Sequence, residues 1–479
     1  MTTMAADAAS TTAAATTTTT TTTTSSSSNP TRPDMDREKE ENVWLVEPPT
    51  PFGVLTASGL DHIVHHKYQA GTYTALDNLL NPLWQYCTDH WLPLWLAPNA
   101  VTALGGTCSL ASYIVTAHYA FDLWQPPHST ERLIPDWVLI FNGICLLLYY
   151  TLDCMDGKQA RRTQSSSPLG QLFDHGVDCL ANLSHLSLMQ AIVGWTPRQY
   201  GLVQSSLQLG FFQAQLEEYY TGTLPHAAGN VGTTEILYGM GVWSILTGLL
   251  DHLGLVRRQE LYTGTVSWIQ SFPLQSIPGI TWLLQQPPSA PLSVKDILFI
   301  VWMCGFGVLT VLSWIRLIRA QPLRSKESSS PWSLWKRTIN ALGKLSSPLI
   351  LCALMIHVSA ATTKNSTATN MGGIRYASLA IGLCFCMITI KLVVLGMARM
   401  AYASLQWADL MPLLLVWAVT TTSSSTPLPL VSPDLAYPLA TAGYLVRLVW
   451  WTKLAVDPLC RKMQIQLFQI PYQKKKKNE

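Results

Sequence analysis

The chain contains a series of apolar runs, each long enough to cross a membrane. A bilayer core is about 30 Å thick, and a helix needs about 20 apolar residues to span it. Such runs occur near 98–119, 135–156, 171–195, 199–220, 234–253, 295–317, 346–362, 374–397, 407–424 and 434–455. Only 12% of the 479 residues are charged, about half the share in soluble domains. The sequence therefore predicts an all-α polytopic membrane protein with about ten transmembrane helices.

The N-terminal region differs from the rest of the chain. Residues 1–42 form a low-complexity Ala/Thr/Ser tract followed by charged residues, which cannot bury enough apolar surface to fold. We expect this segment to be a disordered cytosolic tail. Residues 43–97 mix aromatic and polar residues, which is typical of amphipathic helices that lie along the membrane surface.

Four aspartates interrupt the apolar sequence between residues 149 and 180. Each charge at membrane depth costs roughly 2.5–3.5 kcal/mol on insertion scales. Asp153 and Asp156 close one predicted helix, Asp174 and Asp178 open the next, and each pair shares a helix face. The link 157–170 contains Gly, Ser and Pro and can turn the chain, so that the two faces meet. Four such carboxylates suit a hard cation, Mg²⁺ or Mn²⁺, whereas a single intramembrane Asp would more simply be an ion-pair partner.

Three cationic residues lie between the two acid pairs: Lys158, Arg161 and Arg162. Their donors suit phosphate, although Lys158 and Arg162 fit equally well as ordinary cytosolic flanking charges. Acids and bases at one loop on the membrane edge indicate a diphosphate bridged by metal. The net charge of +3 gives no support for a nucleic-acid partner.

The same stretch resembles a known family. Asp156-Gly157-x-x-Ala160-Arg161, then Gly170, Asp174 and Asp178 at the family's spacing, is similar to the complete signature of the CDP-alcohol phosphotransferases, and Asp153 matches the family's additional acid. The segment ARRTQSSSPLGQLFDHGVD resembles the choline/ethanolamine phosphotransferase branch in particular. A weaker resemblance continues to Lys391 and reappears at FQIPY near the end of the chain.

The resemblance implies a reaction. Phosphocholine or phosphoethanolamine would pass from CDP-choline or CDP-ethanolamine to diacylglycerol, giving phosphatidylcholine or phosphatidylethanolamine and CMP. The four aspartates would hold Mg²⁺ or Mn²⁺. The substrate-binding residues would be Asn99 of a Pro-Asn-x-x-Thr element that ends at Thr102, together with Gly157, Ala160, Arg161, Gly170, Glu217 and Glu218. Locally, the glycines also fit helix caps and the two glutamates a charged helix end.

A general base must take the proton of the lipid hydroxyl. His175 suits this role because its ordinary pKa is near neutrality, and Asp178 then remains a metal ligand. The reverse assignment, with Asp178 as the base, is the alternative. Whether the alcohol is choline or ethanolamine stays open, because the aromatic residues available for a cation–π contact, Tyr68, Tyr73, Trp84, Tyr219 and Tyr220, also suit a membrane interface.

The resemblance also predicts a domain organisation. Residues 98–253 would be the catalytic helices, 254–294 a luminal connection, 295–455 the C-terminal membrane helices and 456–479 a basic cytosolic tail. Lysines and arginines collect on the side of the motif loop and the C-terminus, which the positive-inside rule makes cytosolic. The final lysines resemble a dilysine retrieval signal. We therefore expect a multi-pass protein of the endoplasmic reticulum or Golgi membrane with its active site facing the cytosol.

Several alternatives remain at this level. Another acceptor, inositol or glycerophosphate, fits the motif, although enzymes of that kind are much shorter. A transporter that uses intramembrane acids is a second class, but no second half of the chain echoes the motif. A catalytically dead scaffold is a third. Homodimers are common in the family, so a second copy of the chain is a candidate partner. The sequon at Asn365 falls on the predicted luminal side.

Overall fold

The computed structural model describes residues 55–69, 71–120, 134–229, 231–265, 284, 291–319, 331–364, 372–421 and 431–470. Residues 1–43 and 44–479 are separate units, and every described residue belongs to the second. The predicted tail 1–42, the sequon at Asn365 and the final lysines lie outside the described residues.

The described chain is almost entirely helical, which confirms the predicted all-α class. The helices of the first half are α2 (Ala57–Val64), α3 (Ala75–Trp91), α4 (Pro98–Tyr119), α5 (Asp136–Arg162), α6 (Pro168–Val193), α7 (Pro197–Thr221), α8 (Thr233–His252) and α9 (Arg258–Thr263). Those of the second half are α11 (Val294–Arg319), α12 (Pro331–Lys344), α13 (Ser346–Lys364), α14 (Gly372–Met397), α15 (Trp407–Thr420) and α16 (Pro433–Met463). The strands β1 (Ala227–Ala228) and β2 (Val231–Gly232) form a small antiparallel hairpin before α8.

Each of the ten predicted spans coincides with a helix. By length and composition, α4, α5, α11 and α14 are apolar enough to cross a membrane, and the bent pair of α12 and α13 makes a fifth candidate. The helices α6 and α7 carry many polar residues, and α15 is short. The fold is that of a polytopic membrane protein, and the count of ten spans stays a prediction.

Two boundaries differ from those expected. α5 continues to Arg162, so Asp156 lies inside the helix and the connection to α6 is residues 163–167 rather than 157–170. Gly157 is therefore an interior residue of α5 and does not end the helix. α16 likewise continues to Met463, well past the expected end at residue 455.

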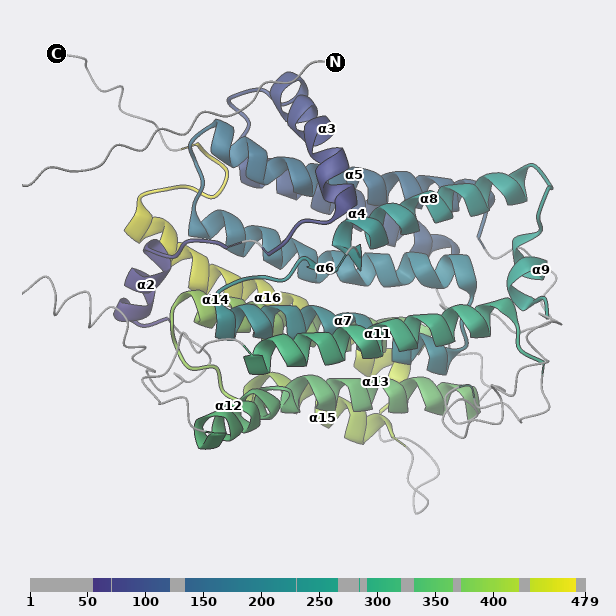
Figure 1. Cartoon of the computed structure of the whole chain (residues 1–479). Coiled ribbons are helices and arrows are strands. Elements are labelled where there is room, and N and C mark those ends of the chain that lie inside the picture. The colour runs from purple at the N-terminus through teal and green to yellow at the C-terminus, as the bar shows by residue number, and fades with distance from the viewer. Residues whose placement is uncertain are drawn as a thin grey trace, which may run out of the picture. The chain divides into compact units, whose positions relative to one another are not determined.

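The long helices lie side by side (Figure 1), and small residues set their closest approach. α5 packs against α4 and α8. A Cβ atom placed on Gly143 of α5 would lie 2.6 Å from the carbonyl oxygen of Gly241 on α8. Ser244 Oγ also donates to the Leu139 carbonyl across the same interface (2.7 Å). In lipid, no hydrophobic effect drives helices together, so their association depends on close packing. Small residues allow that close approach.

The second half of the chain packs around α14, which is buried along almost its whole length. Its Lys391, whose partner the sequence leaves open, donates to Asp409 Oδ2 (2.6 Å), and Arg447 of α16 binds the other oxygen of that carboxylate (2.7 Å). Lys391 therefore has a buried ion-pair role, as intramembrane charges usually do.

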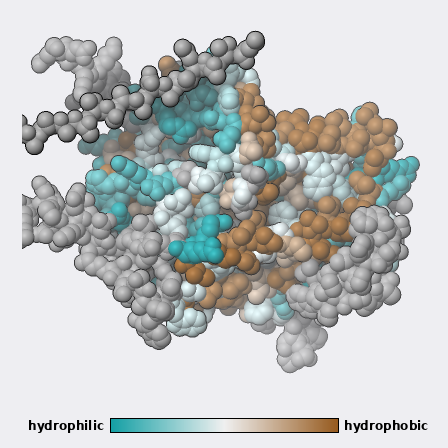
Figure 2. Space-filling model, in the orientation of Figure 1, coloured by the Kyte–Doolittle hydropathy of each residue, from teal (hydrophilic) through white to brown (hydrophobic). Residues whose placement is uncertain are grey.

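Polar and apolar residues occupy different parts of the visible face of the bundle (Figure 2). Apolar residues cover the visible surface over α8 and α11, where Leu246, Val301, Val308 and Val311 are exposed. Hydrophilic residues gather near the place where α5 ends and α6 begins. α3 crosses over α5 at this end (Figure 1), and its apolar residues Leu79, Leu83 and Tyr86 stay exposed. This pattern is typical of a helix on a membrane surface.

Candidate functional site

The site is built where α5 ends and α6 begins. After Arg162 the chain turns within five residues, and Ser167 caps α6 by accepting a hydrogen bond from the Gly170 backbone (3.2 Å). Pro168 is the first residue of α6, where its fixed φ and missing N–H are tolerated. The short turn places the last turns of α5 beside the first turns of α6.

This arrangement brings the predicted acids together. Asp153, Asp156 and Asp174 each offer one oxygen, and these oxygens lie within 4.8 Å of one another. Asp178, one turn deeper along α6, accepts a hydrogen bond from Tyr149 of α5. In the described part of the chain, the Oδ1 atoms of Asp153 and Asp174 are buried and have no hydrogen-bond partner.

The donor set therefore fits a divalent cation. Buried carboxylate oxygens without partners are costly unless a positive charge offsets them. Clustered carboxylates are the usual ligands of Mg²⁺ and Mn²⁺. No lysine or arginine side chain makes an ion pair with these aspartates among the described residues.

The start of α4 supports the cluster. Thr102, which is buried, donates its hydroxyl to Asp156 Oδ2. Asn99 donates from Nδ2 to the backbone carbonyl of Leu467, near the end of the chain (2.7 Å). The Pro-Asn-x-x-Thr element thus reaches the acid cluster with one residue and the C-terminal segment with another.

A cavity of about 230 Å³ opens beside the acids. Of the predicted site residues, it is lined by Asn99, Asp156, Gly157, Ala160, Arg161, Gly170, Asp174 and His175. The other lining residues are Tyr68, Ala97, Pro98, Thr102, Ser165, Ser166, Ser167, Leu169, Gln171, Ile465, Gln466, Leu467 and Gln469. Carboxylates, an exposed arginine and backbone groups thus line the same cavity, which is what a binding site for a charged diphosphate requires.

His175 is buried at the edge of this cavity, and its Nδ1 has no hydrogen-bond partner in the described structure. The Tyr68 ring meets it edge-on, with the ring centroids 6.2 Å apart. The Tyr68 hydroxyl is hydrogen bonded to Nε2 of His226 (2.7 Å), and the ring of Tyr73 stacks on His226. Burial raises the pKa of Tyr68 and lowers that of His226. Near neutral pH, Tyr68 therefore keeps its proton and His226 is uncharged.

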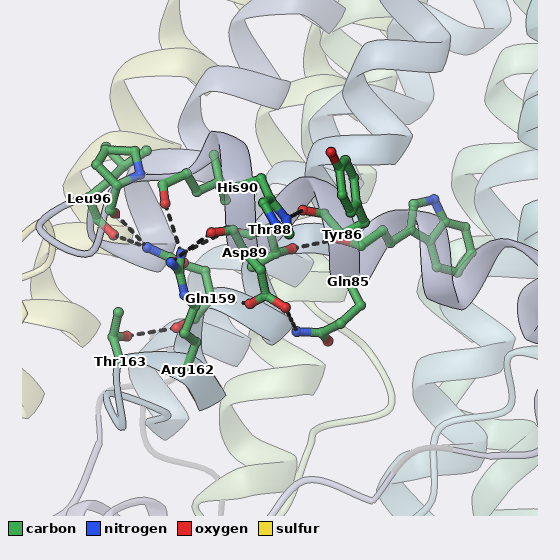
Figure 3. Close-up of polar contacts among 12 residues, drawn as sticks. Gln85, Tyr86, Thr88, Asp89, His90, Leu96, Gln159, Arg162 and Thr163 are labelled. Carbon is green, nitrogen blue, oxygen red and sulfur yellow. Dashed lines mark hydrogen bonds and ion pairs between the residues drawn. The ribbon is translucent and has the colours of Figure 1, made fainter.

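Arg162 and Lys158 have structural partners, and Figure 3 shows those of Arg162. Arg162 donates to the backbone carbonyls of Thr88 and Leu92 (both 2.8 Å) and of Asp89 (2.9 Å). These are carbonyls at the C-terminal end of α3, which the helix itself leaves unpaired. Lys158 donates to Asn81, which is also on α3. Of the three cations in the motif, Arg161 is the one that lines the cavity.

The two glutamates at the end of α7 point to different neighbours. Glu217 accepts from Arg316 Nε (2.7 Å) and from Ser313 (2.9 Å), both on α11. Glu218 accepts from Nε2 of Gln171 (3.0 Å), and Gln171 lines the cavity. Glu218 thus contacts a residue of the cavity wall without lining the cavity itself, whereas Glu217 joins α7 to α11.

The aromatic candidates for a choline contact are also divided. Lys344 lies over the rings of Tyr219 and Tyr220. Trp84 donates to the Tyr238 hydroxyl (3.0 Å). Tyr68 lines the cavity. Tyr73 stacks on His226, which is hydrogen bonded to Tyr68.

Sequence reasoning missed two groups of cavity residues, one inside the motif and one far along the chain. Gln171 and the serines of the 163–167 turn lie inside the motif, where their polarity was the available signal. Residues 465–467 carry no local signal, because nothing in their sequence indicates what they contact. The weak resemblance at FQIPY covers Phe468 and Gln469.

Comparisons with known proteins agree with this geometry. The family model described as CDP-alcohol phosphatidyltransferase matches residues 95–217. The relative named uncharacterized CDP-alcohol phosphatidyltransferase class-I family protein 3 of Dictyostelium discoideum is 25% identical over 433 residues, which cover 87% of this chain and 98% of that protein.

Two named relatives are more similar over a shorter stretch. Cholinephosphotransferase 1 of Homo sapiens is 30% identical over 47% of this chain and 50% of its own length. Choline/ethanolaminephosphotransferase 2 of Arabidopsis thaliana is 32% identical over 48% of this chain and 54% of its own length. The chain thus aligns with about half the length of these two relatives.

Proposed function

We propose that this chain, which belongs to the CDP-alcohol phosphatidyltransferase family over residues 95–217, transfers phosphocholine or phosphoethanolamine from the CDP-alcohol to diacylglycerol. The observation that carries the proposal is the group of three aspartate oxygens within 4.8 Å of one another beside a polar cavity. The names of the human and Arabidopsis relatives support choline or ethanolamine as the alcohol.

Asp153, Asp156 and Asp174 would hold Mg²⁺ or Mn²⁺, with Asp178 as a further ligand behind them. When bound, such a cation offsets the charge of the diphosphate and of the departing CMP. Thr102 keeps one oxygen of Asp156 engaged. The orientation of the carboxylate is thereby fixed before substrate arrives.

The nucleotide half of the donor would lie in the cavity. Arg161 is placed to contact phosphate oxygens, and Gly157, Ala160 and Gly170 leave room for the nucleotide because their side chains are small or absent. Asn99 would contact the nucleotide from the start of α4. In the reaction, the lipid hydroxyl oxygen attacks the phosphorus that bears the alcohol. The bond from that phosphorus to the oxygen it shares with CMP breaks, and CMP leaves with this oxygen.

His175 would take the proton of the attacking hydroxyl. It lines the cavity next to Asp174, and its Nδ1 is not engaged by another described residue. The alternative base, Asp178, is hydrogen bonded to Tyr149, which leaves that carboxylate less available. Glu218 would act by holding Gln171 at the cavity wall rather than by touching His175.

The predicted placement in the cell belongs to the same proposal. The hydrophilic end of the bundle, where α5 meets α6, would face the cytosol of the endoplasmic reticulum or Golgi. Residues 98–253 would form the catalytic part.

The test is an assay of the purified full-length protein in lipid with Mg²⁺, diacylglycerol and either labelled CDP-choline or labelled CDP-ethanolamine. Product is expected with at least one donor, and chelation should remove the activity. Asp156→Ala and Asp174→Ala should abolish turnover, whereas Asp434→Ala, an exposed acid at the start of α16, should not change it. A chain that is folded and lipid-embedded yet makes no product with either donor would rule out the transferase.

The base assignment is tested separately. His175→Ala should lose most of the rate and still bind the CDP-alcohol. A variant that keeps most of its rate would exclude His175 as the base and leave Asp178 as the candidate.

A further inference from the structure

The segment that follows α16 reaches the cavity from outside the family domain. α16 ends at Met463, and the next residue, Gln464, has a positive φ of 54° that redirects the chain. We call residues 465–469 the C-terminal strap. Four of its five residues line the cavity: Ile465, Gln466, Leu467 and Gln469. The strap lies beyond residues 95–217, which the family model matches, so it adds a wall from outside that matched stretch.

Two contacts hold the strap against the motif. The Leu467 carbonyl accepts the hydrogen bond from Asn99 Nδ2 (2.7 Å). The ring of Phe468 meets the ring of Phe173 on α6 edge to face, with centroids 5.5 Å apart and planes at 88°. Just before the strap, Lys462 forms an ion pair with Asp61 of α2.

The strap is not a core element. Gln466, Phe468 and Gln469 are exposed, whereas Ile465 and Leu467 are half-buried and pack against the hydrophobic core. Its specific contacts with the site are the one hydrogen bond to Asn99 and the one ring pair with Phe173. The partial burial of Ile465 and Leu467, together with these two contacts, holds the strap at the cavity wall.

The bond to Leu467 fixes how Asn99 presents its amide. A side-chain amide has a donor end and an acceptor end. The donor end is occupied by the strap, and the acceptor Oδ1 lies on the side of Gly170, 3.5 Å from where a Cβ of that residue would be. Asn99 therefore offers an acceptor to the cavity. A cytidine carries donors that fit it, in its exocyclic amino group and its ribose hydroxyls.

We propose that the C-terminal strap forms a wall of the nucleotide site and that the Leu467 carbonyl positions Asn99 for the cytidine part of the donor. This inference rests on the proposed transferase function. The strap contributes to binding of the nucleotide and not to the chemical step, because its described hydrogen bond and ring pair are with Asn99 and Phe173 rather than with the acid cluster or His175.

Full-length variants test the strap. Phe468→Ala removes the ring contact, Phe468→Tyr keeps it, and Ile470→Ala changes a neighbouring residue that is not part of the cavity lining. Binding of CMP is measured directly, and KM for the CDP-alcohol, KM for diacylglycerol and kcat are measured in lipid. Phe468→Ala should weaken CMP binding and raise KM for the CDP-alcohol by about 2- to 12-fold, the range of an aromatic pair. kcat and the lipid KM should stay unchanged, and Phe468→Tyr and Ile470→Ala should behave as wild type.

A double-mutant cycle tests the route through Asn99. Asn99→Asp replaces the donor with an oxygen that faces the Leu467 carbonyl, so it should repel the strap. If the strap acts through Asn99, Phe468→Ala should cause little further loss of CMP affinity in the Asn99→Asp background, because residues of one network do not contribute additively. Fully additive losses would refute the positioning role.

The two levels of the proposal fail differently. A wild-type protein that neither makes product nor binds CMP refutes the proposed function. If wild type is active while Phe468→Ala keeps the wild-type CMP affinity and KM, the transferase stands and the strap inference is overturned. A Phe468→Ala variant that loses kcat with unchanged CMP affinity overturns it as well.

Discussion

Thr102→Val is the smallest change that separates Asp156 from its hydrogen-bond donor. The Thr102 hydroxyl reaches from α4 to Oδ2 of Asp156 on α5, and both side chains are buried. Valine replaces that hydroxyl with a methyl group and keeps the branched shape. The substitution should therefore leave the packing of α4 on α5 intact and release the carboxylate.

The expected magnitude follows from the type of bond. A hydrogen bond to a charged group contributes about 1.5–3 kcal/mol, which corresponds to about 10- to 150-fold in affinity or rate. Losing a group that orients a metal ligand usually has an effect of 10- to 100-fold. Thr102→Val should thus raise the Mg²⁺ concentration needed for half-maximal activity by about 10- to 100-fold.

The assay is a Mg²⁺ titration of transferase activity at saturating donor and lipid, repeated with Mn²⁺. Thr102→Ser keeps the hydroxyl and serves as the matched control, with a metal dependence close to wild type. Thermal unfolding of both variants checks that the bundle is intact. A Thr102→Val protein with the metal dependence of wild type would show that this hydroxyl does not prepare Asp156 for a cation.

Three further predictions concern the scaffold. Arg162→Ala should lower stability by about 1.5–3 kcal/mol, measured by thermal unfolding, and leave KM for the CDP-alcohol unchanged, whereas loss of a phosphate ligand would raise KM. Gly143→Ala should destabilise the α5–α8 contact by about 1–3 kcal/mol, because its Cβ would meet a backbone oxygen. Gly239→Ala, also in a helix but with open space around it, should not destabilise the protein by the same measurement, because alanine favours a helix over glycine. Burial lowers the pKa of His226 below its ordinary 6.5, so the unfolded chain binds a proton that the folded chain resists. Stability should fall as the pH drops below about 6.5, and unfolding of His226→Asn should depend less on pH in that range.

The sequence alone was sufficient for the features that depend on local spacing. Apolar runs of about 20 residues predict helices because only a helix satisfies its own backbone in lipid, and each predicted run contains a helix in the described part of the chain. The three- and four-residue intervals of the aspartates place each pair on one helix face, and the structure brings Asp153, Asp156 and Asp174 together. The family resemblance is confirmed over residues 95–217, whereas the roles of the site residues stay proposals.

Only the tertiary structure decided which side chains meet across distant parts of the chain. Arg162 binds the end of α3, Glu217 pairs with α11 and Lys391 with Asp409, although each of these residues had other roles open to it in the sequence. The strap meets Asn99 across 368 positions of the chain. The periodicity of a helix repeats every few residues and shows which face a side chain occupies, but the neighbour of that face is set by how all the helices pack together.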